Sequence, residues 1–471
     1  MEDAADEAAQ WGGPASMSAW EGLMWRAEQD HRTRSTGILL EILDSEPDWT
    51  RFVNAVEHTT ARIPRLRDRV VEPPVPVVQP VWSPDPDFAV EEHLRHVRLP
   101  HPGTRQQLLE LCDREWDELI DRTRPPWEMI LITGLDGGRA AAVAFRFHHS
   151  LTDGMGLVQL LRLAHAGDDG AVPATSERRS ASSLGLLAGA ALSVPGRAIG
   201  VARTGLSVSA RTLADPGGSL GGATRYLRSL GRMLAAPASA DSPILSDRSW
   251  GHRLHTLDVP LSGLKAAGAA AGGSVNDAFV AAILGGIRRY HERVGVPAAE
   301  HVVVAMPVSL RRENDPLGGN RFAGIRLPAP GSEKDPVARI HAIREFVLEA
   351  KEEPAIGFLD QLSPMLTRLP TAAIIELSAS MTTSSDLQIS NIRGLTDPVS
   401  LAGAQVTAMY PLGPRPGVAA MVAMITYGDT CCLGLNVDPQ CFPDADALEL
   451  ALREGFDEVL ALGQTDRRVQ R

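Results

Sequence analysis

Residues 145–154 read "FRFHHSLTDG" and join an apolar strand to a helix through a polar turn. Side chains alternate along a strand, so His148 and His149 at its end fall on opposite faces. The next nine residues, "MGLVQLLRL", have apolar side chains at helical spacing, which places Asp153 and Gly154 in the turn. Because α/β folds place reactive groups at strand ends, this turn is a candidate functional site.

A histidine that titrates near neutrality is a natural base for removing a proton from a hydroxyl group. Asp153 could hold the imidazole directly, or it could brace the turn by pairing with an arginine and capping the helix. Its place on the turn favours bracing. Gly154 lets the backbone turn tightly and leaves room for a substrate. Two other interpretations stay open here: purely structural histidines, and a His-x3-Asp metal site, for which no further ligands of convincing spacing are found.

The composition describes a folded protein of more than one domain. The chain has 471 residues, of which 44% are hydrophobic and 22% charged, so two domains of about 200 residues each are expected. The net charge of −12 argues against a general nucleic-acid binder, which needs a basic surface. Four cysteines without a CxxC pair indicate neither a zinc site nor a disulfide framework, so no metal is expected.

The sequence also favours a cytoplasmic location. The first 20 residues are acidic and are not followed by an apolar segment, which argues against export. The longest apolar stretch, 184–194, is shorter than the roughly 20 residues that a spanning helix needs. We therefore expect a protein that does not cross a membrane, although it could lie on the inner membrane face or on lipid droplets.

Strand-like and helix-like patterns alternate over 15–168 and 246–471, whereas 169–245 is rich in Gly, Ala and Ser. These features predict two α/β domains of similar size joined by a long crossover. Scattered arginines in the crossover suit an anionic lipid surface, but a loosely packed connector explains them equally well. The expected strands are 36–43, 139–148, 252–261, 301–311, 387–392 and a hairpin over 418–438; the expected helices are 105–122, 273–293 and 444–462.

Several motifs resemble one known family. "HHSLTDG" matches HHxxxDG, the signature of acyltransferases with the chloramphenicol acetyltransferase-like fold, which includes peptide-synthetase condensation domains. Other segments narrow the resemblance to the bacterial wax ester synthase/diacylglycerol acyltransferase family. They occur in the same order as in the family, and the resemblance runs from about residue 17 to 463. These segments are "MSAWEGLMWRAEQD" (17–30), "RPPWEMILITGL" (124–135), "SVNDAFVAAILGGIRRY" (274–290), "MPVSLR" (306–311), "GGNRFAGIRLP" (318–328) and "SNIRG" (390–394).

The resemblance implies two acetyltransferase-like domains with an active-site channel between them. The implied reaction moves a long-chain acyl group from acyl-CoA, without a further cofactor, to diacylglycerol or a long-chain alcohol in a ternary complex. His149 would be the general base, and His148 would orient the site. Asn276 of the "ND" motif is the candidate oxyanion donor, with helix capping as the alternative, whereas Asp277 would order the start of the helix.

Other matched positions are expected to line the channel or to be structural, namely Pro126, Trp127 and Asn391. The sequence departs from the family at Pro126, where the family has leucine, and at Arg393, where it has proline. Both departures bear on substrate selectivity. Two alternatives remain: an acyltransferase with a specialised alcohol or amine acceptor, and a non-catalytic protein that binds lipid droplets. The intact His149, Asp153 and Asn276 disfavour the second alternative.

Overall fold

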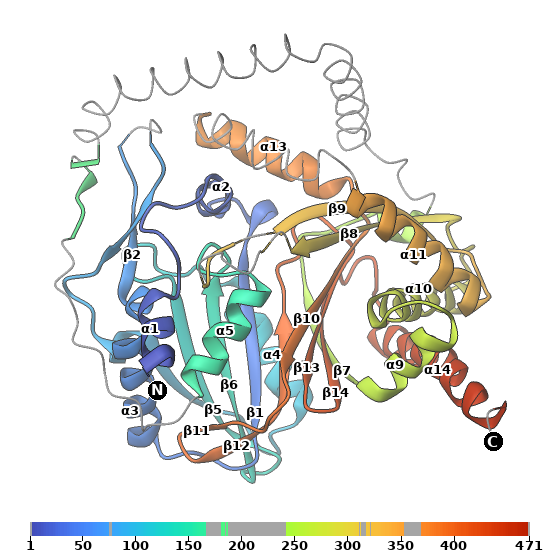
Figure 1. Cartoon of the computed structure of the whole chain (residues 1–471), viewed down its shortest axis with the longest axis horizontal. Helices are drawn as coiled ribbons and strands as arrows, with labels where there is room; N and C mark the ends of the chain where they lie inside the picture. Colours follow the sequence, from blue (N-terminus) through green and yellow to red (C-terminus); the bar gives the residue numbers. More distant parts are fainter. Residues whose placement is uncertain are drawn as a thin grey trace.

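The computed structural model describes residues 2–74, 78–165, 180–183, 185–186, 242–309, 311, 317–320, 322–352 and 369–469. Most of the crossover expected at 169–245, including its arginines, lies outside the described residues. The described chain forms two six-stranded sheets that stand side by side (Figure 1).

The first sheet holds the histidine turn at the end of a central strand. Its strand β6 lies between β1 and β5, antiparallel to both, and β4 runs parallel to β5 at one edge. The strands in spatial order are β11 (Ser400–Leu401), β12 (Ala404–Leu412), β1 (Thr36–Leu43), β6 (Ala140–His148), β5 (Trp127–Leu135) and β4 (Leu94–Arg98). Buried residues of three helices pack in the same hydrophobic core as this sheet; the helices are α3 (Trp49–Arg62), α4 (Arg105–Asp117) and α5 (Gly154–Ala164).

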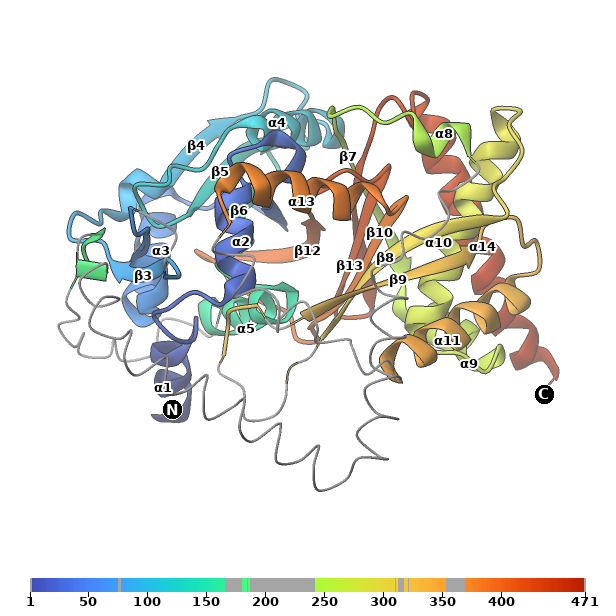
Figure 2. The same cartoon turned by 90° about the horizontal axis from the view of Figure 1, so that it is seen from above.

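The second sheet carries most of its helices on one side (Figure 2). Its strands in spatial order are β7 (Arg253–Pro260), β14 (Thr430–Val437), β13 (Ala420–Tyr427), β10 (Leu387–Leu395), β8 (His301–Ser309) and β9 (Phe322–Pro330). The helices are α9 (Leu261–Ala270), α10 (Val275–Arg293), α11 (Pro336–Glu352) and α14 (Ala445–Val469). Residues Ala278 to Ile287 of α10 are all buried, because this helix is packed between its neighbours in the second core.

The smaller elements complete the described chain. They are α1 (Glu2–Gln10), α2 (Ala19–Ala27), η1 (His31–Thr33), η2 (Pro64–Arg67), β2 (Asp68–Val71), β3 (Val81–Pro84), η3 (Val90–His93), α8 (Pro243–Ser246) and α13 (Thr371–Thr383). All four cysteines are buried free thiols. Within the described ranges, no single helix has the length and apolar composition of a membrane span; α9 and α10 meet that test only together, as a pair bent by 97°.

The expected strands and helices are confirmed, with most ends shifted by at most three residues; α4 ends at Asp117 and not at 122, and α14 continues to Val469 beyond the expected 462. The turn of the predicted hairpin lies at Gly428, whose φ of 55° is the left-handed conformation that glycine favours. The sheets do not follow the expected division at residue 245, however. β11 and β12 belong to the C-terminal part of the sequence, yet β12 pairs antiparallel with β1 and extends the first sheet. The α13 helix likewise packs on α2.

Candidate active site

The backbone of both histidines is held by the residues that directly precede β5 and β1. The amide of His148 donates to the carbonyl of Pro126 at 3.0 Å, and the amide of His149 donates to the carbonyl of Ser35 at 2.8 Å. The strand therefore ends with its last two residues fixed, and the turn that follows begins from a rigid base.

His148 is an enclosed side chain with only 2% of its surface exposed. Its Nδ1 accepts a hydrogen bond from the backbone amide of Ser150 at 3.0 Å, so the proton of the neutral ring lies on Nε2. Nε2 lies 3.7 Å from a carboxylate oxygen of Glu28, and the ring meets Trp25 edge-on with centroids 5.0 Å apart. Burial lowers the pKa of His148 to about 3, helped by Arg122 and His149. The accepting nitrogen is already occupied, which suits a residue that supports its neighbour.

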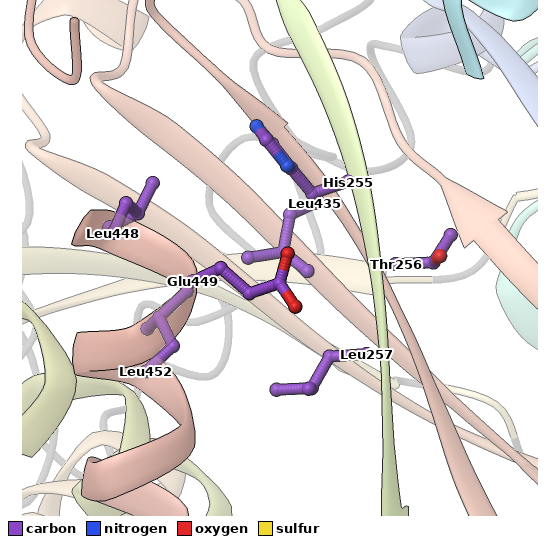
Figure 3. A pocket seen from close by; sticks show the side chains of 7 residues that line it. All are labelled: His255, Thr256, Leu257, Leu435, Leu448, Glu449 and Leu452. Carbon is purple, nitrogen blue, oxygen red and sulfur yellow. The ribbon is translucent and has the colours of Figure 1, made fainter. Parts of the chain in front are cut away.

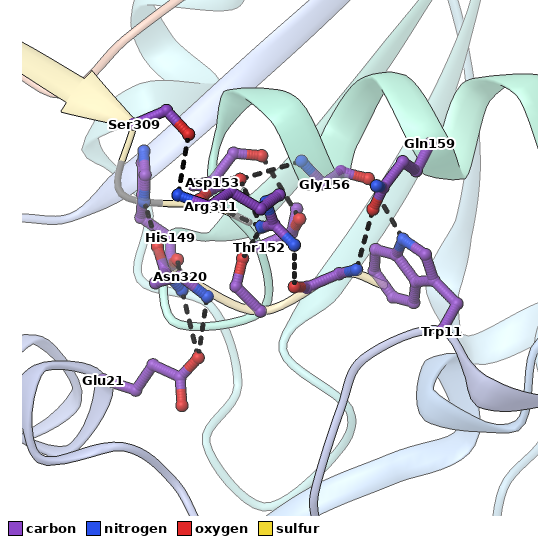
Figure 4. A network of polar contacts seen from close by, with 12 residues as sticks. Trp11, Glu21, His149, Thr152, Asp153, Gly156, Gln159, Ser309, Arg311 and Asn320 are labelled. Atoms are coloured by element: carbon purple, nitrogen blue, oxygen red, sulfur yellow. Dashed lines mark hydrogen bonds and ion pairs between the residues drawn. The ribbon is translucent and has the colours of Figure 1, made fainter. Parts of the chain in front are cut away.

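His149 is half-buried and meets a residue from the other half of the chain. Its Nδ1 lies 3.2 Å from Oδ1 of Asn320, which precedes β9 (Figure 4). The amide nitrogen of Asn320 in turn donates to the backbone carbonyls of His149 and Ser150, at 2.9 and 3.2 Å. Burial lowers the pKa of His149, while the charge of Asp153 and the hydrogen bond with Asn320 act in the opposite direction. The lowered pKa favours the neutral ring, which is the form that a general base needs before it acts.

Asp153 braces the turn in both of the ways that its position predicts. Its Oδ1 accepts from the amide of Gly156 at 2.8 Å and caps α5. Both carboxylate oxygens also accept from Nη2 of Arg311, at 3.1 and 3.2 Å, and the backbone amide of Asp153 donates to Gly319. The carboxylate thus joins the turn to the segment that follows β8.

The described residues 317–320 form a short loop that lies against the turn (Figure 4). Thr152 and Gly319 form an isolated parallel β-bridge, and the amide of Gly318 donates to the side chain of Gln159 at 2.8 Å. The backbone amide of Gly12 donates a hydrogen bond to the carbonyl of Leu317 in the same loop, at 2.9 Å. The site is therefore assembled from segments that are far apart in the sequence.

The structure gives Gly154 a role in addition to the one expected. The space beside it is filled, because an added Cβ would lie 2.9 Å from Cδ1 and Cγ1 of Ile392 on β10. Glycine is needed here so that α5 can begin in close contact with the second sheet. The expectation that Gly154 also leaves room for a substrate is not tested by this contact and stays a prediction.

The "ND" motif lies at the start of α10. Ser274 is the N-cap and forms a capping box with Asp277, whose carboxylate accepts from the Ser274 amide at 2.8 Å. Asp277 is 2% exposed, and Arg344 lies 3.4 Å from it. The prediction that Asp277 orders the helix start is therefore confirmed. Asn276 is half-buried and is not the cap; its role as an oxyanion donor stays a prediction.

Trp127 is the first residue of β5 and Pro126 directly precedes it, and both are buried. The indole of Trp127 donates to the carbonyl of Leu66 at 2.7 Å and stacks on His93 with centroids 4.5 Å apart. These contacts are those of a packing residue. Asn391 and Arg393 are exposed on β10, on the strand face opposite to Ile392.

Three residues at the site were not assigned a role from the sequence: Glu21, Arg311 and Asn320. Each lies inside a segment that carries the family resemblance, respectively residues 17–30, 306–311 and 318–328. Glu21 accepts from the backbone amide of Asn320 at 3.0 Å. The position of Arg311 at the end of the predicted strand 301–311 was the one available signal, since the bracing of Asp153 requires an arginine.

A separate pocket lies between β7, β14 and α14 (Figure 3). None of the predicted site residues is among the residues that line it, which are His255, Thr256, Leu257, Leu435, Leu448, Glu449 and Leu452. Burial lowers the pKa of His255. We assign this pocket no part in the reaction.

Comparison with solved structures defines the class of the protein. The fold is similar to a wax ester synthase/diacylglycerol acyltransferase from Marinobacter aquaeolei VT8, with a TM-score of 0.60 at 21% identity over 95% of this chain and 100% of that chain. It is also similar to the first condensation domain of the calcium-dependent antibiotic synthetase, with a TM-score of 0.58 at 16% identity over 95% and 96% of the two chains. The chain therefore has the chloramphenicol acetyltransferase-like fold, and the helix α5 that follows the HHxxxDG turn contacts β10 of the second sheet.

The sequence comparisons define the family. Residues 17–279 match the wax ester synthase/diacylglycerol acyltransferase catalytic domain, and residues 318–459 match the corresponding C-terminal domain. A Mycobacterium tuberculosis protein, named provisionally as a diacylglycerol O-acyltransferase, is 36% identical over 454 residues, which cover 93% of this chain and 90% of the relative. A second relative from the same species is 27% identical, over 86% and 82% of the two chains. This chain belongs to the wax ester synthase/diacylglycerol acyltransferase family and is an acyltransferase.

Proposed function

We propose that this enzyme transfers a long-chain acyl group from acyl-CoA to the hydroxyl group of diacylglycerol or of a long-chain alcohol, with His149 as the general base. The observation that carries the proposal is the position of the half-buried imidazole of His149 directly after β6, where its Nδ1 lies 3.2 Å from Oδ1 of Asn320 in a loop from the other half of the chain. The name of the 36% identical relative supports diacylglycerol as the first acceptor to test.

The reaction needs one base and no covalent enzyme intermediate. His149 removes the proton of the acceptor hydroxyl as its oxygen attacks the thioester carbonyl carbon. The tetrahedral intermediate collapses, the carbon–sulfur bond breaks, and the imidazolium returns the proton to the CoA thiolate. Asn276 is proposed to donate to the oxyanion, a contribution commonly worth about 3–4 kcal/mol. Asp153 and His148 act indirectly, by holding the turn and the strand end.

We also propose that the enzyme works at the cytoplasmic face of a membrane or on lipid droplets. Its proposed acceptors are oily, and arginines at 197–232 of the sequence suit an anionic lipid surface. Flotation with anionic vesicles, for the whole chain and for a variant lacking 184–210, tests this part. Equal recovery of both proteins in the vesicle fraction would show that residues 184–210 are not needed for lipid binding.

The main experiment measures ester formation from palmitoyl-CoA by the wild-type enzyme and by His149→Ala, with diacylglycerol or hexadecanol as the acceptor and products identified by mass. We expect ester from the wild type and a fall of about 100- to 10,000-fold for His149→Ala, the range for losing a general base. His301→Ala is the matched control, because that side chain is 60% exposed on β8. Undiminished turnover by His149→Ala would remove it as the base, and no ester from either acceptor would point to a specialised acceptor.

A further inference from the structure

We infer that Asn320 is a positioning residue that fixes the tautomer of His149, so that the proton lies on Nδ1 and the lone pair on Nε2. This inference rests on the proposed function of His149 as the base. It assigns a role to a residue that follows the histidine by 171 positions in the sequence.

The orientation of the Asn320 amide is determined by its surroundings. Its Nδ2 lies 2.9 Å from the carbonyl oxygen of His149, 3.2 Å from that of Ser150 and 3.4 Å from Oε1 of Glu21. All three are acceptors, so the NH₂ group must face them. A flipped amide would turn its oxygen toward three other oxygens. Oδ1 therefore faces the imidazole.

The amide orientation determines the state of the imidazole. Oδ1 of Asn320 can only accept, so the Nδ1 that lies 3.2 Å away must carry the proton. A contact with the backbone carbonyl of His149 itself acts in the same sense, because a carbonyl also only accepts. The lone pair then lies on Nε2, the nitrogen that can take a proton from a hydroxyl. His148 has the opposite tautomer, because the amide of Ser150 donates to its Nδ1.

Asn320 is itself held from two sides. Its backbone amide donates to Oε1 of Glu21 at 3.0 Å, and Glu21 is fixed in the capping box of α2 through the Ser18 amide at 2.7 Å. The neighbouring Gly319 bridges to Thr152 of the histidine turn. A side chain on a loop anchored in this way can hold an imidazole in one orientation, which is the condition for efficient general-base catalysis.

The charged and titratable groups around His149 give the inference a pH signature. The charge of Asp153 favours the protonated imidazole, and Arg311 is paired with that carboxylate. Glu21 accepts a hydrogen bond from the backbone amide of Asn320, and His148 directly precedes His149 in the chain. The hydrogen bond from Nδ1 to Asn320 also favours the protonated form. Removing this bond should lower the titration midpoint of His149, whereas a carboxylate in its place should raise the midpoint.

The first test observes the tautomer without using activity. The protein is labelled with ¹⁵N-histidine, and the signal of His149, one of 13 histidines, is assigned by its loss in His149→Gln. We expect a neutral wild-type ring protonated on Nδ1, a mixture of tautomers with a lower midpoint in Asn320→Ala, and a higher midpoint in Asn320→Asp. A wild-type ring protonated on Nε2, or an unchanged tautomer and midpoint in Asn320→Ala, would overturn the inference.

Gln159→Ala is the matched control, since it removes a side-chain amide that holds the same loop through Gly318. It should leave the tautomer and the midpoint of His149 unchanged. If the carboxylate of Asn320→Asp prevents folding because it faces the carbonyls of His149 and Ser150, the wild type and Asn320→Ala still decide the question.

The second test is kinetic. Asn320→Ala should lower kcat on the order of 10- to 100-fold, the scale for losing a group that orients a functional imidazole, with little change in KM for acyl-CoA. The acidic limb of its pH–rate profile should move to lower pH, and that of Asn320→Asp to higher pH. Equal shifts in both variants would indicate only structural damage. If the wild type forms no ester yet its ring is protonated on Nδ1, the proposed function fails while the tautomer assignment stands.

Discussion

Arg311 and Asp153 join the two halves of the chain through a close ion pair in which one guanidinium nitrogen lies 3.1 and 3.2 Å from the two carboxylate oxygens. Only 11% and 9% of the two side chains are exposed, so salt should screen this pair weakly. The same carboxylate caps α5 through Gly156. One side chain thus sets both the start of the helix and the contact between the sheets.

Asp153→Ala should therefore lower stability and activity together. The loss of an N-cap costs about 1 kcal/mol, and a buried charge left unpaired costs about 3–5 kcal/mol. Thermal unfolding should show a decrease of several degrees in Tm. Asp153→Asn keeps a good capping residue but removes the charge, so its Tm should fall between those of the wild type and Asp153→Ala. Equal Tm values for all three proteins would contradict the bracing role.

Gly154→Ala should be destabilising because its Cβ would lie 2.9 Å from two atoms of Ile392. Overpacking of this kind typically costs about 1–3 kcal/mol. Gly324→Ala on β9 is the control, since its Cβ would meet nothing within 4 Å. Shortening the neighbour in Gly154→Ala/Ile392→Ala should recover part of the loss relative to the sum of the two single changes. Strictly additive decreases in Tm would show that the two residues do not conflict.

The buried carboxyl group of Glu28 should make the stability of the protein depend on pH. Burial raises the pKa of its carboxyl group from 4.5 to about 7. The folded state thus favours the protonated form, and the resulting stability is present below pH 4.5 and is lost as the pH rises to about 7. Glu28→Gln imitates the protonated form, so it should match the wild-type Tm near pH 5 and exceed it at pH 8.

The contribution of the neighbouring His148 to folding stability changes with pH in the opposite direction. Its pKa is lowered from 6.5 to about 3, so its contribution is present above pH 6.5 and is lost as the pH falls toward 3. Both proteins keep this histidine, so the difference in Tm between Glu28→Gln and the wild type isolates the carboxyl group. A difference that is the same at pH 5 and pH 8 would show that Glu28 does not titrate in this range.

Substitutions at the two residues of the "ND" motif should have different effects, one on catalysis and the other on stability. Asp277→Ala breaks the capping box with Ser274 and should lower Tm, by an amount that corresponds to about 1 kcal/mol or more. Asn276→Ala should lower kcat by about 100- to 1000-fold with a nearly unchanged Tm, if it donates to the oxyanion. Measuring kcat and Tm for both variants tests this division. A normal kcat in Asn276→Ala would remove it as the donor.

The expected strands, the expected helices and the histidine turn could be predicted because their signals are local, whereas β5, β9 and β12 were not among the expected strands. The alternation in residues 139–148 and the helical spacing after Gly154 are each contained in a short window. Asn320 and Arg311 could not be placed in this way, because their partners lie 171 and 158 residues away. The close contact between Gly154 and Ile392 could not be predicted for a similar reason, since Ile392 comes from the second sheet.

The pairing of β1 with β12 has a consequence for how the protein is made. Asp44 and Gln405, which are hydrogen-bonded beside this pair, are 361 residues apart, an interval that a ribosome covers in roughly 20–70 s. For that time the apolar strand "TGILLEIL" lacks the neighbour that covers its outer edge. An uncovered edge of this kind attracts strands of other chains. The nascent protein therefore needs protection from self-association until β12 has been synthesised.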